Sequence, residues 1–293
     1  MKGFCSINPY ATLIYFLSIL LITMFISNPV IQAISLIGSL LLLWELSDVK
    51  AFFSDLLFYT LIFLLITITN PLFSHNGETP LFFLIGNPVT LEALLYGMQT
   101  GTMMISVICW CKALSRIFTA DKIMCVLGKT TPKLALIISM TLRFIPLLKR
   151  QFKKIINAQK TLGVYSQESK TDRLKATASN MSVLTGWSME NALDTANAMK
   201  SRGYGLKPRS EYSLFNRTVS DLLFSITVIT LTTIIIISSA NNELRFNFFP
   251  MLSEIKSSAL SITAYLSFAI LSSMPFLIET EEKIKWKFYI SKI

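Results

Sequence analysis

The sequence predicts an all-α membrane protein: a polytopic bundle of about six spanning helices with a central block of amphipathic helices. Of the 293 residues, 52% are hydrophobic and only 15% are charged. Soluble domains carry about 25% charged residues, so this chain has too little polar surface to cover its apolar side chains in water. Long apolar runs also recur in both halves of the chain. Together, these observations exclude a soluble enzyme.

Six apolar runs are the candidate spans, because each approaches the ~17 to 25 residues that a membrane helix needs. Asparagine followed by proline separates the first two runs, and the same pair at Asn70 and Pro71 is expected to end the third. The runs cover residues 11–27, 29–45, 51–70, 93–115, 217–240 and 253–278.

Basic residues are concentrated between the fourth and fifth spans. Residues 149–209 contain twelve Lys or Arg and four Asp or Glu, a net charge of +8, whereas residues 71–92 contain no Lys or Arg. Because basic loops stay on the cytoplasmic side, we predict that this block and both termini are cytoplasmic. Charge alone leaves nucleic acid, anionic lipid and an acidic protein open as partners of the block.

Few residues have the chemistry of a catalytic or metal site. His75 is the only histidine, and the four cysteines show no disulfide framework. Asp55 is expected to be isolated near the inner end of the third span, and Lys112 and Arg116 lie at the inner end of the fourth. We interpret all three as anchors at the membrane interface.

The apolar stretch 134–148 is too short for an ordinary span and contains Arg143 and Pro146. A re-entrant or interfacial helix, or one packed beneath the bundle, would fit its length and its arginine. Arg143 has two interpretations. It caps carbonyls or pairs with an acid at the junction of membrane and cytoplasmic parts, or it reaches lipid phosphates.

Two amphipathic helices follow, one after Pro146 that ends near Gly163 and one over residues 179–200 that ends at Gly203. Ser188, Ala192 and Ala196 recur at helical spacing in the second and would let another backbone approach closely. From the residues alone, the pair is either a helical hairpin that caps the bundle or a docking element for an acidic partner. We therefore divide the chain into N-terminal spans (1–116), a cytoplasmic or interfacial block (117–215) and C-terminal spans with a basic tail (216–293).

Three segments carry a resemblance to a known family: MTLRFIPLL at 140–148, AQKTLGVY at 158–165 and AMKSRGYG at 198–205. They resemble the hallmark segments of the EcfT/CbiQ family, the transmembrane coupling subunits of energy-coupling factor (ECF) ABC transporters. The layout of the whole chain is similar as well. The resemblance implies a non-catalytic subunit in a bacterial or archaeal cell membrane, which couples ATP hydrolysis by partner proteins to uptake of a vitamin or metal ion.

The resemblance also implies partners and docking residues. Two ABC ATPase subunits, which hold the ATP and Mg²⁺, would dock on the two helix ends, and a small hydrophobic substrate-binding protein, the S component, would lie beside this chain in the lipid. The chain itself would bind no cofactor. Each family motif is Ala-Arg-Gly. The second falls on Ser201, Arg202 and Gly203, whereas the first falls on Thr161, Leu162 and Gly163, where leucine replaces the arginine. Arg143, Pro146 and the small trio would transmit the movement.

Two other classes remain open. A conventional ABC importer permease would line the substrate path itself and contact its ATPases through a Glu-Ala-Ala-type loop, which the sequence does not show. A membrane-embedded enzyme would need clustered acids or histidines, but His75 and Glu78 have no further partners in their loop. A role with nucleic acid is not expected, because no recognised module is present.

Overall fold

In the computed structural model, which describes residues 4, 7–74, 77–84, 87–162, 170–206 and 218–290, the chain divides into two units. Unit 1 combines Met1–Ile123 with Phe215–Ile293, and unit 2 is Met124–Leu214. Helix α5 (Ala120–Thr130) lies at the boundary between their residue ranges, and the helices α6 (Pro132–Thr161) and α7 (Lys170–Ser201) belong to unit 2.

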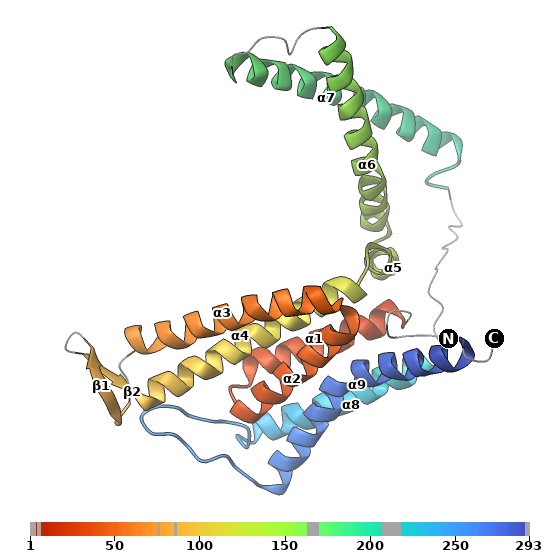
Figure 1. Cartoon of the computed structure of the whole chain (residues 1–293). Coiled ribbons are helices and arrows are strands. Elements are labelled where there is room, and N and C mark those ends of the chain that lie inside the picture. The colour runs from red at the N-terminus through yellow and green to blue at the C-terminus, as the bar shows by residue number, and fades with distance from the viewer. Residues whose placement is uncertain are drawn as a thin grey trace. The chain divides into compact units, whose positions relative to one another are not determined.

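Unit 1 contains the apolar helices and a short antiparallel β-hairpin (Figure 1). Its elements are α1 (Pro9–Phe25), α2 (Pro29–Leu46), α3 (Val49–Phe73), β1 (Pro80–Leu84), β2 (Asn87–Thr90), α4 (Leu91–Ile117), α8 (Val219–Ala240) and α9 (Ala259–Ile290).

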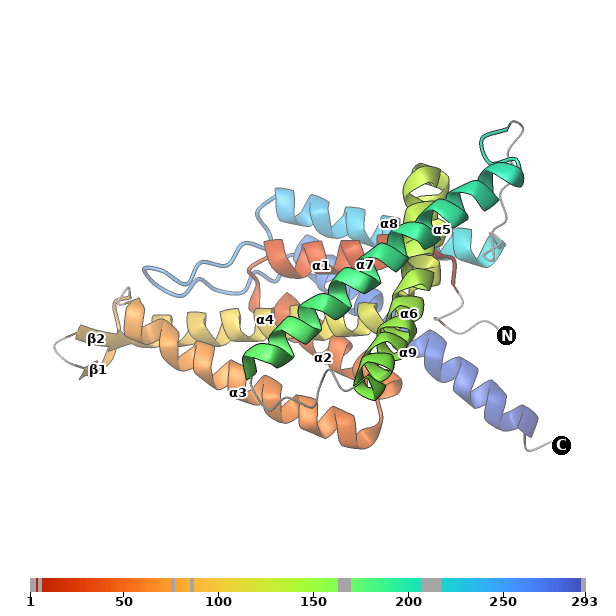
Figure 2. The same cartoon turned by 90° about the horizontal axis from the view of Figure 1, so that it is seen from above.

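Five helices of unit 1 form a closed ring. In order around it, α1 packs on α4, α4 on α2, α2 on α9, α9 on α8, and α8 on α1. Helix α3 lies outside this ring and packs chiefly on α4, as Figures 1 and 2 both show. The ring helices therefore have two or more neighbours each, whereas α3 leaves most of its surface open.

An aromatic cluster fills the core of unit 1. Tyr15, Phe16 and Trp110 are fully buried, and their ring centroids lie 5.2–6.2 Å apart in edge-to-face or near edge-to-face arrangements. The Trp110 indole N–H donates a hydrogen bond to Ser35 Oγ (3.0 Å), and the Tyr15 hydroxyl donates to the Leu271 carbonyl (3.2 Å). Both polar tips of these buried rings are therefore satisfied.

Glycines set the closest helix contacts. A Cβ on Gly38 of α2 would lie 2.8 Å from Ser272 Cβ of α9, and one on Gly101 of α4 would lie 2.9 Å from the Phe63 ring of α3. Distances this short leave no room for a methyl group, so the backbones approach as in small-residue membrane crossings.

Asparagine-proline pairs start the first two helices, and of these only the pair at Asn28 and Pro29 was predicted from the sequence. The Asn8 side chain accepts the Tyr10 N–H (3.1 Å), and the Asn28 side chain accepts the Val30 N–H (3.0 Å). Proline at the first helical position lacks an N–H that would have had no partner there, which makes this start favourable.

Five helices among the described residues are long and apolar enough to cross a membrane: α2, α3, α4, α8 and α9. Helix α1 is apolar but has 17 residues, a length of about 25 Å against the ~30 Å of a hydrocarbon core. The prediction of an all-α, multi-pass membrane protein is confirmed.

Several predicted helix boundaries are wrong; α7 begins at Lys170 rather than at residue 179, and α9 continues to Ile290 rather than ending at residue 278. Pro71 lies inside α3, and Pro146 lies inside α6, which joins the two segments that the sequence separates there into one helix. Each proline removes a single intrahelical hydrogen bond, and the long helix around it tolerates that loss. The last helix begins at Ala259 rather than at residue 253, because Ser258 Oγ accepts the Ser261 N–H at its start.

Asp55 is not isolated, contrary to the prediction, because its carboxylate forms an ion pair with Lys112 of α4. Arg116 also has protein partners and donates to the Leu46 carbonyl (2.6 Å) and to Ser47 Oγ (2.7 Å) at the end of α2. These contacts tie α3 and α2 to α4 and satisfy three charged groups that the sequence suggested were simple interfacial anchors.

Candidate functional site

Helices α6 and α7 cross within unit 2, and both views show the crossing (Figures 1 and 2). Phe144 of α6 and Trp187 of α7 stack there, with ring centroids 6.2 Å apart and planes 4° from parallel. The sequence did not suggest this contact. Its only local signal is that Trp187 is the single tryptophan between residues 124 and 214.

A groove runs beside this crossing. We call it the α6–α7 groove; it encloses about 550 Å³ and includes Arg143, Phe144 and Arg150 of α6 with Ala192, Ala196 and Met199 of α7. Ala192 and Ala196, which the sequence proposed as a close-approach surface, are exposed. The groove has two cationic side chains and an apolar floor.

The remaining coupling candidates lie on the same two helices. Arg143 and Pro146 are exposed on α6. Ser188 is half-buried, and its hydroxyl donates to the Thr185 carbonyl one turn earlier (2.8 Å). Arg143 forms no ion pair within the part of the chain that the structure describes.

Helix α7 ends in a Schellman motif. Gly203 has φ +81°, its N–H donates to the Lys200 carbonyl (3.0 Å), and the Tyr204 N–H donates to the Met199 carbonyl (3.0 Å). Glycine is needed at this position because a left-handed backbone is strained with any L side chain. The sequence-predicted C-cap at Gly203 is therefore confirmed.

This C-terminal end of α7 presents charged and apolar groups to the surroundings. Ser201 and Arg202 are exposed, Tyr204 is 52% exposed and Leu206 is 76% exposed. The last carbonyls of a helix carry partial negative charge, which favours an arginine beside them. The guanidinium keeps its donors available for an external acceptor, because it has no ion-pair partner among the described residues.

Helix α6 ends at Thr161, and Leu162 is its C-cap residue. The Leu162 side chain is 78% exposed. The Thr161 hydroxyl donates to the Ala158 carbonyl (2.7 Å). Gly163, the third residue of this predicted motif, lies outside the described residues.

The described basic side chains of unit 2 form no close ion pairs. None of the described basic side chains of α6, of α7 and of the residue after α7 forms an ion pair with a described acid, since the ion pairs found all lie in unit 1. These side chains are Lys133, Arg143, Lys149, Arg150, Lys153, Lys154, Lys160, Lys175, Lys200 and Arg202. The positive electrostatic potential around the two helices would therefore attract an acidic partner.

Comparison with known families decides the classification. The sequence pattern of the CbiQ family, described as cobalt transport protein, matches residues 5–214, which is most of the chain. This chain belongs to the CbiQ family. The family predicted from the three sequence segments is thus confirmed, and so is a role in membrane transport.

Curated relatives support the same assignment. The CbiQ-family chain is 39% identical over 93 residues to the energy-coupling factor transporter transmembrane protein EcfT of Lactobacillus helveticus, covering 31% of this chain and 34% of that protein. It is 40% identical over 101 residues to the EcfT protein of Listeria innocua, covering 33% and 38%. The matched region thus spans about a third of the length of these relatives.

Proposed function

We propose that this CbiQ-family chain is the transmembrane coupling component of an ECF-type ABC importer. In this role it binds two ABC ATPase subunits through the ends of α6 and α7 and holds a small hydrophobic S component. ATP and Mg²⁺ bind in the ATPases, so this chain takes no catalytic step. The family match and the EcfT relatives support the proposal.

The observation that carries the proposal is the exposed end of α7. Arg202 has no ion-pair partner among the described residues, and a Schellman motif fixes the backbone beside it. A guanidinium on a rigid helix end makes charge-assisted, often bidentate hydrogen bonds to carboxylates. We infer that it enters an acidic groove of one ATPase, while Tyr204 and Leu206 make apolar contacts around it.

The end of α6 would dock by different chemistry. Leu162 occupies the position of the family's arginine and is largely exposed, and burying a leucine side chain is worth about 1.5–3 kcal/mol. We infer an apolar pocket on the second ATPase. Different pockets for the two ends favour two non-identical ATPase subunits.

Movement of the docked ends would reach the membrane through the helices themselves. When the ATPases close on ATP, the two helix ends move with them. The α6–α7 crossing then sets how that displacement is divided between the two helices. The stacked Phe144 and Trp187 rings resist sliding at the crossing. The S component, whose cargo is a vitamin or metal ion by this proposal, would then reorient in the bilayer and release it inside.

The test is a mild-detergent purification of the tagged full-length chain from its native membrane, followed by mass spectrometry of the bound proteins. Two ATPase subunits with a small, very hydrophobic membrane protein are expected. ATPases with a soluble or lipid-anchored binding protein would instead favour a conventional ABC permease. Recovery of the intact chain with no ATPase would refute both transporter assignments.

A further inference from the structure

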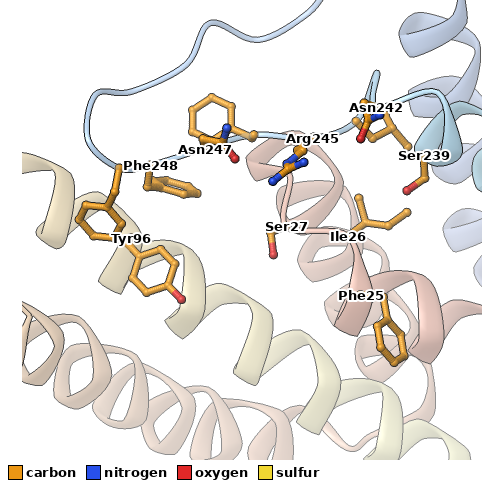
Figure 3. Close-up of a pocket in the computed structure, with 12 residues that line it drawn as sticks. Phe25, Ile26, Ser27, Tyr96, Ser239, Asn242, Arg245, Asn247 and Phe248 are labelled. Carbon is orange, nitrogen blue, oxygen red and sulfur yellow. The ribbon is translucent and has the colours of Figure 1, made fainter. Parts of the chain in front are cut away.

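A polar pocket lies at one end of unit 1, beneath the segment 241–258 that connects α8 to α9. We call it the Arg245 pocket; it encloses about 460 Å³. Its lining includes Ser27, Tyr96, Asn242, Arg245, Asn247 and Phe248. Figure 3 shows Arg245 extending from this segment toward Ser27, with Tyr96 and Phe248 on the other side.

The pocket is held in shape by contacts of its own walls. The Asn28 side-chain amide donates to the carbonyl of buried Leu244 (3.2 Å), which fastens the segment to the start of α2. The Tyr96 and Phe248 rings pack with centroids 5.5 Å apart. The Asn247 N–H donates to Ser253 Oγ (2.9 Å), which closes the segment on itself. The cavity is therefore preformed rather than a gap below a loose connection.

Arg245 is an exposed cation without an anion in this pocket. It forms no ion pair with any residue that the structure describes. The neighbouring charges are engaged elsewhere, since Glu243 accepts the Ser258 hydroxyl (2.8 Å) and Lys256 donates to the Asn242 carbonyl (3.1 Å). Glu254 is exposed, does not line the pocket and forms no ion pair among the described residues.

An apolar groove adjoins this pocket along the bundle. This α1–α8 groove encloses about 520 Å³ and is lined by Leu21 and Ile22 of α1 and by Thr232 and Ile236 of α8. It shares the lining residues Phe25, Ile26 and Ser239 with the Arg245 pocket, so the two cavities adjoin each other. Leu21 and Ile236 are 45% and 59% exposed. Because both helices are strongly apolar, this open side faces acyl chains when the protein is in a bilayer.

We propose that the Arg245 pocket and the α1–α8 groove together bind one anionic phospholipid of the membrane. The phosphodiester pairs with the Arg245 guanidinium and accepts hydrogen bonds from the Asn242 and Asn247 amides, and one acyl chain lies in the groove. An arginine suits this role because its planar donors match phosphate oxygens and its charge is weakly hydrated. The occupant is a lipid rather than free phosphate, because an apolar groove adjoins the Arg245 pocket. The site does not depend on the proposed coupling function.

The test is native mass spectrometry of the purified full-length chain with added phosphatidylglycerol or phosphatidylcholine of identical acyl chains. One cation near anionic lipid is worth about fivefold in affinity, so we expect at least that preference for phosphatidylglycerol. Arg245→Gln should remove the preference. The control Lys287→Gln removes the same charge from α9 outside both cavities and should keep it. sn-Glycerol 3-phosphate, which lacks acyl chains, should not compete.

A second variant tests the groove independently. Ser239→Phe places a large ring where the two cavities join, so it should lower binding of both lipids by severalfold while Arg245 stays in place. Size-exclusion chromatography checks that each variant remains monodisperse. Equal binding of the two lipids by the unaltered chain would overturn the proposal without any variant. An unchanged preference in Arg245→Gln, or competition by sn-glycerol 3-phosphate, would also overturn it.

Discussion

Arg202 and Leu162 occupy corresponding positions at the ends of α7 and α6, and they would contribute to docking in opposite ways. A hydrogen bond from the charged Arg202 side chain would contribute about 1.5–3 kcal/mol, but only where the partner places an acceptor in the right position. The exposed leucine gains free energy from any apolar pocket of suitable size. The two positions should therefore tolerate different substitutions.

Reversing the charge of Arg202 should disrupt the proposed docking. Arg202→Glu places a carboxylate in an acidic groove, so ATPase recovery in the affinity purification should fall about tenfold or more. Lys175→Glu makes the same charge change near the other end of α7 and serves as the control. Equal loss in both variants would mean that only the overall charge of unit 2 matters.

Leu162→Arg restores the arginine of the family motif but should weaken docking at the α6 end. An apolar pocket cannot hold a guanidinium without losing its hydration, so association of one ATPase should fall about threefold to tenfold. Leu162→Met conserves volume and apolar character, and it should bind as the unaltered chain does. Tighter association of the arginine variant would show that this pocket is acidic after all.

At the level of helices, side chains adjacent in sequence predicted the start of α2 and the end of α7, because the Asn28-Pro29 pair and the Gly203 cap act locally. Pro71 and Pro146 misled the prediction, since a long helix with other stabilising contacts absorbs one lost hydrogen bond. The Phe144–Trp187 stack was not predictable, because it joins residues far apart in the chain. The α6–α7 groove was not predictable either, because its lining residues also come from two separate helices.

The contact of α2 with α9 gives a test of helix packing. Gly38→Ala puts a methyl group 2.8 Å from Ser272 Cβ, and such overpacking costs about 1–3 kcal/mol. Gly186→Ala in α7 meets nothing within 4 Å and should instead gain up to about 1 kcal/mol from helix propensity. Thermal unfolding in one detergent should show a lower midpoint for Gly38→Ala and no decrease in the midpoint for Gly186→Ala. A higher midpoint for Gly38→Ala would mean that the two helices separate easily.

For the whole molecule, hydropathy and charge predicted the class of fold but not how its helices are connected in space. The length of the apolar runs identifies which segments enter the membrane, whereas the ring order of α1, α4, α2, α9 and α8 depends on contacts such as Gly38 with Ser272. Orientation was predicted from the distribution of lysine and arginine, and it remains a prediction.

Cysteine labelling tests that orientation. In a chain whose four native cysteines are replaced by alanine, the Leu252→Cys variant should react with a membrane-impermeant maleimide in intact cells. The Lys287→Cys variant should react only after permeabilisation, because the basic tail is expected to be cytoplasmic. The reverse pattern would invert the proposed topology and place the ends of α6 and α7 away from any ATPase.

The position of α3 outside the closed ring has a consequence for motion in the plane of the bilayer. A ring helix can leave only by breaking interfaces with two neighbours, whereas α3 breaks chiefly one, with α4, along with the Asp55–Lys112 ion pair. Apart from the bond lost at Pro71, its backbone hydrogen bonds are internal, so separation would break side-chain contacts such as the Asp55–Lys112 ion pair and leave the helix itself intact. Unit 1 therefore combines a closed frame of helices with one helix that is held mainly on a single side, so separation of α3 from α4 would open this bundle toward the lipid rather than along its axis.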